Sequence, residues 1–194
     1  GGAAVVVRGG TKGMGRAAAE RFAADGARVA VLGRGREALD DTVAALTAAG
    51  AADTLALQAD LTDQASIAAA FAEVDARWGE LNTLVNAAGP VEVGVAPFEM
   101  LDDDAWHATF DIGTLSAIRC VRAALPLLRK AEWARVVNVS AHSTRRQSPA
   151  LVAYTASKAA LTSLSKNLAQ SLAPEGILVN TVSPGSFLSA GMKG

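Results

Sequence analysis

The 194-residue sequence is poor in cysteine, in tyrosine, in net charge and in long apolar runs. Its one cysteine, Cys120, excludes a disulfide framework and is interpreted as a small buried hydrophobe. Eighteen basic and nineteen acidic residues nearly cancel, with no block of one sign, so we expect neither nucleic acid nor a membrane as a partner. No run approaches the ~18 apolar residues of a membrane span and no signal peptide stands out, which favours a cytoplasmic protein.

Apolar, β-branched runs alternate with alanine-rich segments of helical period along the chain. Buried strands are predicted at residues 3–8, 28–33, 54–58, 81–89, 135–140 and 177–183. Helices are predicted between them, at residues 15–26, 36–50, 64–78, 103–130 and 152–172. Strands separated by helices need crossover connections, so we expect an α/β fold with a doubly wound parallel sheet covered on both faces. No linker interrupts this pattern, which indicates a single domain over residues 1–194.

A glycine-rich turn follows the first predicted strand. Residues 8–15 read RGGTKGMG, with Gly9, Gly13 and Gly15 in a G-x-x-x-G-x-G spacing. Glycines allow a tight turn, and they let backbone N–H groups approach a pyrophosphate at the start of the next helix, where the helix dipole favours anions. An ordinary strand-to-helix turn is the alternative, but the position between the first strand and the first helix favours dinucleotide binding.

The end of the second predicted strand bears on which dinucleotide is bound. It reads LGRGR, so Arg34 and Arg36 stand where an NAD-specific site usually has a carboxylate for the ribose 2′-hydroxyl. Lys12 adds a cation within the phosphate turn. NADP(H) is therefore favoured, and NAD(H) stays open because both arginines could also belong to a solvated helix start.

The single tyrosine, Tyr154, precedes Lys158 by one helical turn in the stretch AYTASKAAL. Residues i and i+4 share a helix face, so both side chains can reach one small volume. An ammonium ~4 Å from a phenol supplies about 4 kcal/mol at an effective dielectric of 20, enough to lower a pKa of ~10 by ~3 units. We therefore expect Lys158 to lower the pKa of Tyr154, and Tyr154 to exchange a proton with a carbonyl or alcohol oxygen.

The chain resembles the short-chain dehydrogenase/reductase family along nearly all of its length. The matching stretches are GGTKGMG (9–15), ADLTD (59–63), LVNAAG (84–89), RVVNVS (135–140), YTASK (154–158) and VNTVSPG (179–185). The resemblance implies a Rossmann-like fold and NAD(P)(H)-dependent oxidation of alcohols or reduction of ketones. It also implies that Tyr154 is the catalytic acid/base, and that Lys158 lowers its pKa and holds the nicotinamide ribose.

Further cofactor contacts are implied by the same resemblance. Asp60 and Leu61 would border the adenine, residues 86–89 would line the cofactor channel, and residues after the last strand would flank the nicotinamide. The expected cofactor-binding residues are Gly9, Thr11, Lys12, Gly13, Met14, Gly15, Arg34, Asp60, Leu61, Asn86, Ala87, Ala88, Gly89, Tyr154, Lys158, Pro184, Gly185 and Ser189. No metal ligand is expected.

Three positions depart from the family's pattern around the site. Arg8 replaces a threonine whose hydroxyl braces the turn, and Ala87 replaces an asparagine that braces neighbouring strands. Gly113 stands at the position of the family's active-site asparagine, inside the predicted helix 103–130. This glycine either keeps a bend in the helix and holds a water through its carbonyl, or it serves close helix packing.

The fourth departure concerns the carbonyl-binding serine, whose family position thirteen residues before the tyrosine is occupied by Ala141. Losing one preorganised donor typically lowers the rate about a hundred- to a thousandfold. Ser140 is included with Tyr154 and Lys158 in the expected catalytic set, Ser143 is the alternative, and true loss of the role is the third reading. His142 is interpreted as an exposed polar loop residue.

These features predict an NADP(H)-dependent oxidoreductase that interconverts a ketone and a secondary alcohol, both small molecules. The alternative is a family member that binds the cofactor with weak or no catalysis and acts as a binding or sensing oligomer, a hypothesis favoured by Gly113 and Ala141. A homodimer or homotetramer is expected by resemblance. The family adds a last strand and helix after P-G, and a chain that ends at Gly194 is expected to lack them.

Overall fold

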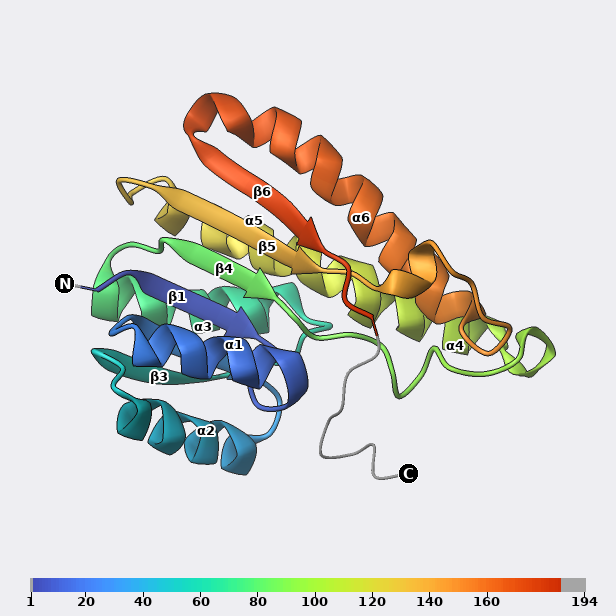
Figure 1. Ribbon diagram of the computed structural model, residues 1–194, viewed down its shortest axis with the longest axis horizontal. Helices are drawn as coiled ribbons and strands as arrows, with labels where there is room; N and C mark the ends of the chain where they lie inside the picture. The colour runs from blue at the N-terminus through green and yellow to red at the C-terminus, as the bar shows by residue number, and fades with distance from the viewer. Residues whose placement is uncertain (1, 186–194) are drawn as a thin grey trace.

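The computed structural model describes residues 2–185, and its six strands form one parallel sheet (Figure 1). The strands are β1 (Ala4–Arg8), β2 (Arg28–Gly33), β3 (Asp53–Gln58), β4 (Thr83–Asn86), β5 (Ala134–Val139) and β6 (Ile177–Val182). Their order across the sheet is β3-β2-β1-β4-β5-β6. The strand order therefore reverses between β1 and β4, which is where doubly wound sheets bind ligands.

Helices connect the strands. They are α1 (Gly13–Ala24), α2 (Arg36–Ala49), α3 (Gln64–Trp78), α4 (Asp103–Phe110), α5 (Ser116–Leu128) and α6 (Val152–Leu172), with the 3-10 turns η1 (Phe98–Met100), η3 (His142–Thr144) and η4 (Ala173–Glu175) and the π-helical segment η2 (Asp111–Leu115). Asp63 caps α3 by accepting from the backbone N–H groups of Ala65 and Ser66. Gly50 and Gly79 end α2 and α3 in the left-handed conformation that glycine adopts without strain.

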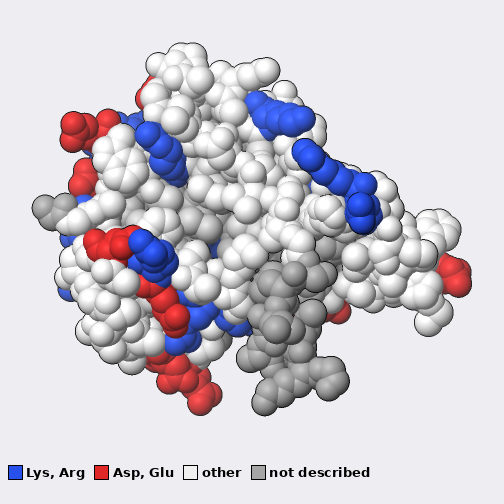
Figure 2. Space-filling view, in the orientation of Figure 1, with Lys and Arg blue, Asp and Glu red and all other residues white. Residues whose placement is uncertain are grey.

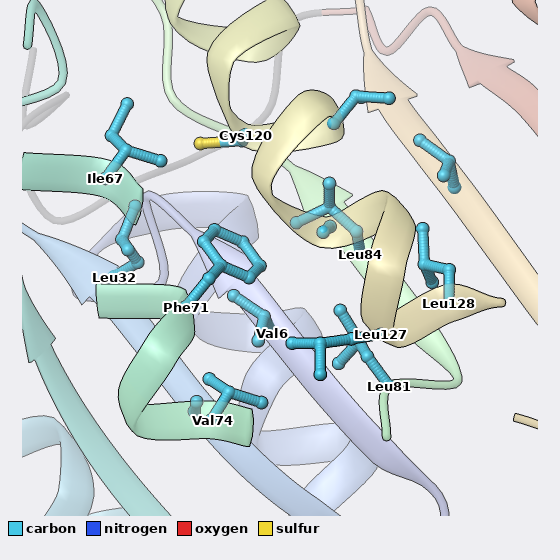
Figure 3. Packing of buried hydrophobic residues seen from close by; sticks show 14 of the residues in the cluster. Val6, Leu32, Ile67, Phe71, Val74, Leu81, Leu84, Cys120, Leu127 and Leu128 are labelled. Atoms are coloured by element: carbon cyan, nitrogen blue, oxygen red, sulfur yellow. The ribbon is translucent and has the colours of Figure 1, made fainter. Parts of the chain in front are cut away.

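Two apolar layers hold the sheet between helices. Side chains alternate along β1, so Val6 joins Phe71 of α3 and Leu127 of α5 on one face (Figure 3), while Val7 joins Leu46 of α2 on the other. All five residues of β1 and all four of β4 are buried, so the centre of the sheet is enclosed on both faces. Burial of this kind is the main driving force for the fold.

The two faces of β6, at the edge of the sheet, differ in exposure. Ile177 and Val179 are buried beneath α6, whereas Leu178 and Val182 on the opposite face are 44% and 47% exposed. An edge strand with one solvent-exposed face contributes less buried apolar area than a central strand.

The fold class predicted from the sequence is confirmed, with two local differences. The strand predicted at 81–89 ends at Asn86, because residues 87–89 leave the sheet to form part of the site. The single helix predicted at 103–130 is divided by the π-helical segment η2, which carries Gly113. A π-turn takes up one residue more than an α-turn, and a period of 3.6 does not reveal it.

The surface and the cysteine agree with the composition. Acidic and basic side chains are mixed over the α1–α2 side of the face in Figure 2. Cys120 lies on the buried face of α5, and burial raises the pKa of its thiol to about 11, as expected for a residue that acts as a hydrophobe. Of the helices within residues 2–185, none combines the length and the apolar character that crossing a bilayer requires.

Candidate active site

The predicted site residues gather at the carboxyl ends of β1, β4 and β5 and at the start of α6. Arg8, Asn86 and Asn138 are register partners on β1, β4 and β5, so their side chains form one polar row across the sheet. Within the row, Arg8 Nε donates to Asn86 Oδ1 (3.0 Å) and Asn86 Nδ2 donates to Asn138 Oδ1 (2.8 Å). The row marks the β1–β4 switch point as a polar site in an otherwise apolar interior.

The glycine turn has the shape of a phosphate cradle. Gly9 and Gly13 have φ of 76° and 56°, which favour glycine, and a Cβ on Gly15 would overlap the carbonyl oxygen of Gly9. In the described chain no side chain caps the first turn of α1, so its backbone N–H groups remain for an anion. Thr11 and Met14 are half-buried in the same turn. These residues fit the pyrophosphate of a dinucleotide.

The predicted 2′-phosphate cations lie on either side of an acid that the sequence did not single out. Glu92 carboxylate oxygens lie 3.7 Å from Lys12 Nζ and 3.6 Å from Arg34 Nη2. Arg36 turns away, with Nη1 3.3 Å from Asp40 Oδ1. All three side chains of the Glu92 group are largely exposed, so the pairs contribute little to stability. An acid in a loop gives no sequence signal, and only the fold brings residues 12, 34 and 92 together.

Asp60 and Leu61 follow β3 and face different surroundings. The exposed Asp60 carboxylate accepts bonds from the backbone N–H and the hydroxyl of Thr62 (2.9 and 2.7 Å), and these bonds lower its pKa. Leu61 has its side chain in the core, so it can offer a ligand only its backbone. Asp60 therefore stays a fixed, charged acceptor at the edge where the adenine is expected.

Gly89 lies between the predicted acid/base and its lysine. A Cβ on Gly89 would lie 3.3 Å from Lys158 Nζ and 3.8 Å from Tyr154 Cε2, so both side chains meet at this point of the β4 loop. The loop also runs next to the glycine turn, since a Cβ on Gly9 would lie 2.6 Å from the backbone nitrogen of Ala88. Residues 87–89 are half-buried, whereas Asn86 is buried in the polar row.

The electrostatics of this pair differ from the expectation. Burial raises the pKa of Tyr154, opposite to the lowering expected from Lys158. Burial, and after it the charge of Arg8, lower the pKa of Lys158 to about 7. Lys158 Nζ donates to the carbonyl of Val139 (2.9 Å) and more distantly to that of Ala88 (3.5 Å). A lysine that titrates near neutrality does not supply the permanent charge on which the expected lowering depended.

The structure does not support Ser140 as the carbonyl-binding serine. Its hydroxyl is 2% exposed and lies 2.7 Å from the hydroxyl of Thr162 and 3.1 Å from the carbonyl of Lys158, to which it donates, so it joins β5 to α6. Ser143, the alternative, is half-buried in η3 and accepts from the hydroxyl of Thr155 (2.9 Å). The position one residue after β5 pulls Ser140 inward, because side chains alternate at strand ends.

The structure supports close helix packing at a bend as the role of Gly113. It lies in the π-helical segment η2, and a Cβ there would overlap the hydroxyl of Ser157 on α6. Thr114 Oγ1 donates to the carbonyl of Ser157 (2.8 Å), which holds the two helices together at this point. The glycine thus permits close packing at an irregular turn.

The last predicted contacts lie after β6. The carbonyl of Pro184 accepts from the backbone N–H of His142 (2.9 Å), which keeps the end of β6 beside the β5 loop. Gly185 is exposed, and Ser189 lies outside the described residues. A cavity of about 610 Å³ also borders α6, but none of the predicted site residues that the structure describes lines it. Its walls are Gln147, Ser148, Pro149, Leu151, Val152, Thr155 and Ala156.

Known proteins resemble this chain in sequence and in structure. The 3beta-hydroxysteroid dehydrogenase of Mediterraneibacter gnavus is 36% identical over 180 residues, which cover 93% of this chain and 64% of that protein. The solved Pseudomonas aeruginosa RhlG/NADP active-site complex has 33% identity and a TM-score of 0.91, covering 99% of this chain and 75% of that one. An NAD+-bound xylitol dehydrogenase has 27% identity and a TM-score of 0.89, covering 94% and 70%.

These matches extend over nearly the whole chain, which spans about two thirds of the length of the curated relatives. Residues 3–194 match the sequence profile of the family described as short chain dehydrogenase. The sheet order, the glycine turn and the Tyr154–Lys158 helix agree with that match. The chain therefore belongs to the short-chain dehydrogenase/reductase family of oxidoreductases.

Proposed function

We propose that this chain is an NADP(H)-dependent oxidoreductase that interconverts a ketone and a secondary alcohol. The observation that carries the proposal is the meeting of Tyr154 and Lys158 at Gly89, on a loop adjacent to the glycine turn. A site for a dinucleotide and a site for proton exchange are thereby neighbours. When bound, the nicotinamide supplies or accepts the hydride.

The residues of the chain bind and orient the reactants around that hydride transfer. The backbone N–H groups at the start of α1 would hold the pyrophosphate, and Asp60 would border the adenine. Lys158 would hold the nicotinamide ribose through the ammonium that now donates to Val139 and Ala88. Gly89 leaves the space in which these groups converge, since a side chain there would fill it.

Tyr154 would move the proton. Burial raises the pKa of its phenol, so the phenol is protonated at neutral pH. A protonated phenol can donate to a carbonyl oxygen, which suits reduction of a ketone; the reverse direction needs the phenolate and is favoured by higher pH. General acid catalysis of this kind typically contributes about 10²–10⁴-fold in rate.

NADP(H) is favoured over NAD(H) because the end of β2 presents Arg34 and no carboxylate, with Lys12 opposite. Glu92 neutralises these cations in part and would have to release them to a 2′-phosphate. We therefore expect Arg34→Ala to weaken NADPH binding about tenfold while changing NADH binding little. Calorimetric dissociation constants for both cofactors test this. Tighter binding of NADH by the parent protein would reject the preference.

The proposed chemistry is tested by following NADPH absorbance with a panel of ketones. The panel includes steroid ketones, because one relative is named as a hydroxysteroid dehydrogenase. Tyr154→Phe should lower turnover about 10²–10⁴-fold while leaving the NADPH dissociation constant within a few fold. An unchanged rate in this variant would refute the role of the tyrosine.

The second candidate function is a cofactor-binding member of the family without appreciable catalysis. Ala141 favours it, because neither neighbouring serine is bonded to Tyr154 in the described structure. Thermal stabilisation of the protein by NADPH, with no turnover of any ketone or alcohol in the panel, would select this function over the enzyme.

A further inference from the structure

Arg8 is the most unusual side chain near the site. It stands at the carboxyl end of β1, is 0% exposed, and is among the largest fully buried side chains of the described residues. An arginine is charged at neutral pH even when burial lowers its pKa, as it does here. In residues 2–185 no carboxylate pairs with it, so its hydrogen bonds alone compensate the loss of water.

The guanidinium connects three walls of the site. Nε donates to Asn86 Oδ1 (3.0 Å) and Nη2 donates to the carbonyl of Ala88 (3.1 Å), both next to the cofactor channel. Nη1 donates to the hydroxyl of Ser116 on α5, which in turn donates to the carbonyl of Ile112 in η2. A short side chain at this position could not reach β4 and α5 together, whereas all three nitrogens of the planar guanidinium donate hydrogen bonds here.

Arg8 and Lys158 share an acceptor. The carbonyl of Ala88 lies 3.1 Å from Arg8 Nη2 and 3.5 Å from Lys158 Nζ. Two cations held by one oxygen in a buried site repel each other, and the arginine cannot relieve the repulsion by releasing its proton. Lys158 is therefore the group that responds, and the direction of its pKa shift, downward with Arg8 as the second cause after burial, agrees.

Among residues 2–185, Arg8 is the one charged side chain that shares a hydrogen-bond acceptor with Lys158. Tyr154 is neutral and lies one turn away on the same helix. The remaining titratable side chains on elements packed against α6 are exposed, paired or distant: Asp103, Asp104 and His107 of α4, Asp111 of η2 (paired with Arg119), His142 of η3, Arg135 of β5, Lys166 of α6 and Glu175 of η4 (paired with Arg129).

We propose that Arg8 is a positioning residue of this site: it fixes the Ala88 carbonyl against which Lys158 is held, and it places a permanent positive charge next to Lys158. The proposal rests on the proposed function for its catalytic meaning. In this chain the charge of Arg8 takes the place of the neutral hydroxyl usual in the family, and its reach offsets the asparagine missing at Ala87.

The decisive experiment is an NMR titration of labelled lysine side chains, with the Lys158 signal assigned by Lys158→Arg. In the parent protein Lys158 should titrate near neutrality, well below the ordinary value of a lysine. In Arg8→Thr and in Arg8→Met the midpoint should rise by roughly one pH unit or more, because the like charge that shares an acceptor with Lys158 is gone. Arg135→Met, which removes an arginine near the other end of β5, should leave the midpoint unchanged.

The pH dependence of ketone reduction gives the second readout. A step that needs charged Lys158 is lost as pH rises through the pKa of that residue, so removing Arg8 should move the alkaline limb to higher pH. Freeing the Ala88 carbonyl should at the same time lower kcat more than it raises KM. A merely structural arginine would lower the amount of folded protein without moving either midpoint.

Two outcomes would overturn the proposal. One is a parent protein in which Lys158 titrates at the ordinary value of a lysine, a result that needs no variant that might misfold. The other is an unchanged Lys158 midpoint in both Arg8 variants. The titration does not depend on turnover, so failure of the proposed enzyme activity, seen with Tyr154→Phe, remains distinguishable from failure of the Arg8 proposal.

Discussion

At the scale of single residues, Ala141 stands where the family usually has a carbonyl-binding serine. The side chain lies at the start of the loop after β5, is 7% exposed and cannot donate a hydrogen bond. Ser140 is bonded to α6, and Ser143 is bonded to Thr155. Of the three residues expected to be catalytic, Tyr154 and Lys158 meet at Gly89, whereas Ser140 is turned toward α6.

Restoring a hydroxyl at this position should increase activity. We expect Ala141→Ser to raise kcat about tenfold to a hundredfold with a smaller change in KM, since a preorganised donor acts mainly on the developing charge. Steady-state kinetics with a ketone that the parent protein reduces would measure it. Ala150→Ser, an exposed alanine of the same loop, is the matched control. No gain at 141 together with a large loss in Ser143→Ala would show that Ser143 already has the role.

At the scale of elements, the turn between β1 and α1 is the part most intolerant of added volume. A methyl group on Gly15 would meet the carbonyl of Gly9, whereas one on Gly35 would find its nearest neighbour at 3.9 Å. Gly15→Ala should therefore lower cofactor affinity at least about tenfold and the free energy of unfolding by about 1–3 kcal/mol. Gly35→Ala should stay within about 0.5 kcal/mol. Denaturation with and without NADPH compares the two variants. Equal stability and equal stabilisation by NADPH in both would contradict the role of this turn as a phosphate cradle.

The hydrogen bonds that join β3 to α3 should make the free energy of unfolding depend on pH. Asp53 accepts from Arg77 (2.8 and 3.0 Å) and from Trp78 Nε1 (3.0 Å), and the bond to Arg77 is the main cause that lowers its pKa to about 2. Because the folded pKa is below the unfolded one, this contribution is complete above about pH 4 and is lost as pH falls toward 2. Asp53→Asn should lower the free energy of unfolding by about 1 kcal/mol at pH 6.

Urea denaturation from pH 6 down to pH 3 measures that difference, which should narrow below pH 4. Asp25→Asn removes an exposed partner of Arg21 and should change stability little at any pH. A difference for Asp53→Asn that stays constant between pH 6 and pH 3 would show that the carboxylate charge is not what stabilises the contact between β3 and α3.

Local patterns predicted the elements well, and contacts distant in sequence explain what they missed. The strands and most helices follow from hydrophobic periodicity and from glycine punctuation, both of which operate over a few residues. The π-helical segment and the inward turn of Ser140 depend on packing against α6. The contact of Arg8 with Ser116 joins positions 108 residues apart. The sequence therefore shows only that Arg8 replaces the family's usual threonine, and it does not predict the partners of the guanidinium.

At the scale of the whole molecule, large apolar side chains remain on the surface beside α4. Phe98 and Met100 of η1 are 67% and 73% exposed, and the Phe98 ring lies edge-on to Trp106 with centroids 6.5 Å apart. We propose that the protein forms a homodimer or homotetramer, as its resemblance to the family implies, because patches of this kind favour association. Sedimentation at micromolar concentration should show the oligomer, and a monomer throughout would reject it.

The unequal burial of the two faces of β6 has a consequence for local opening of the fold. The strand is buried on the face that packs against α6 and solvent-exposed at Leu178 and Val182, whereas β1 is buried on both faces. Backbone amides of β6 should therefore exchange with heavy water sooner than those of β1, in an opening that stops short of unfolding. Since α6 packs on β6, the helix that carries Tyr154 and Lys158 rests on a strand whose other face is open to solvent.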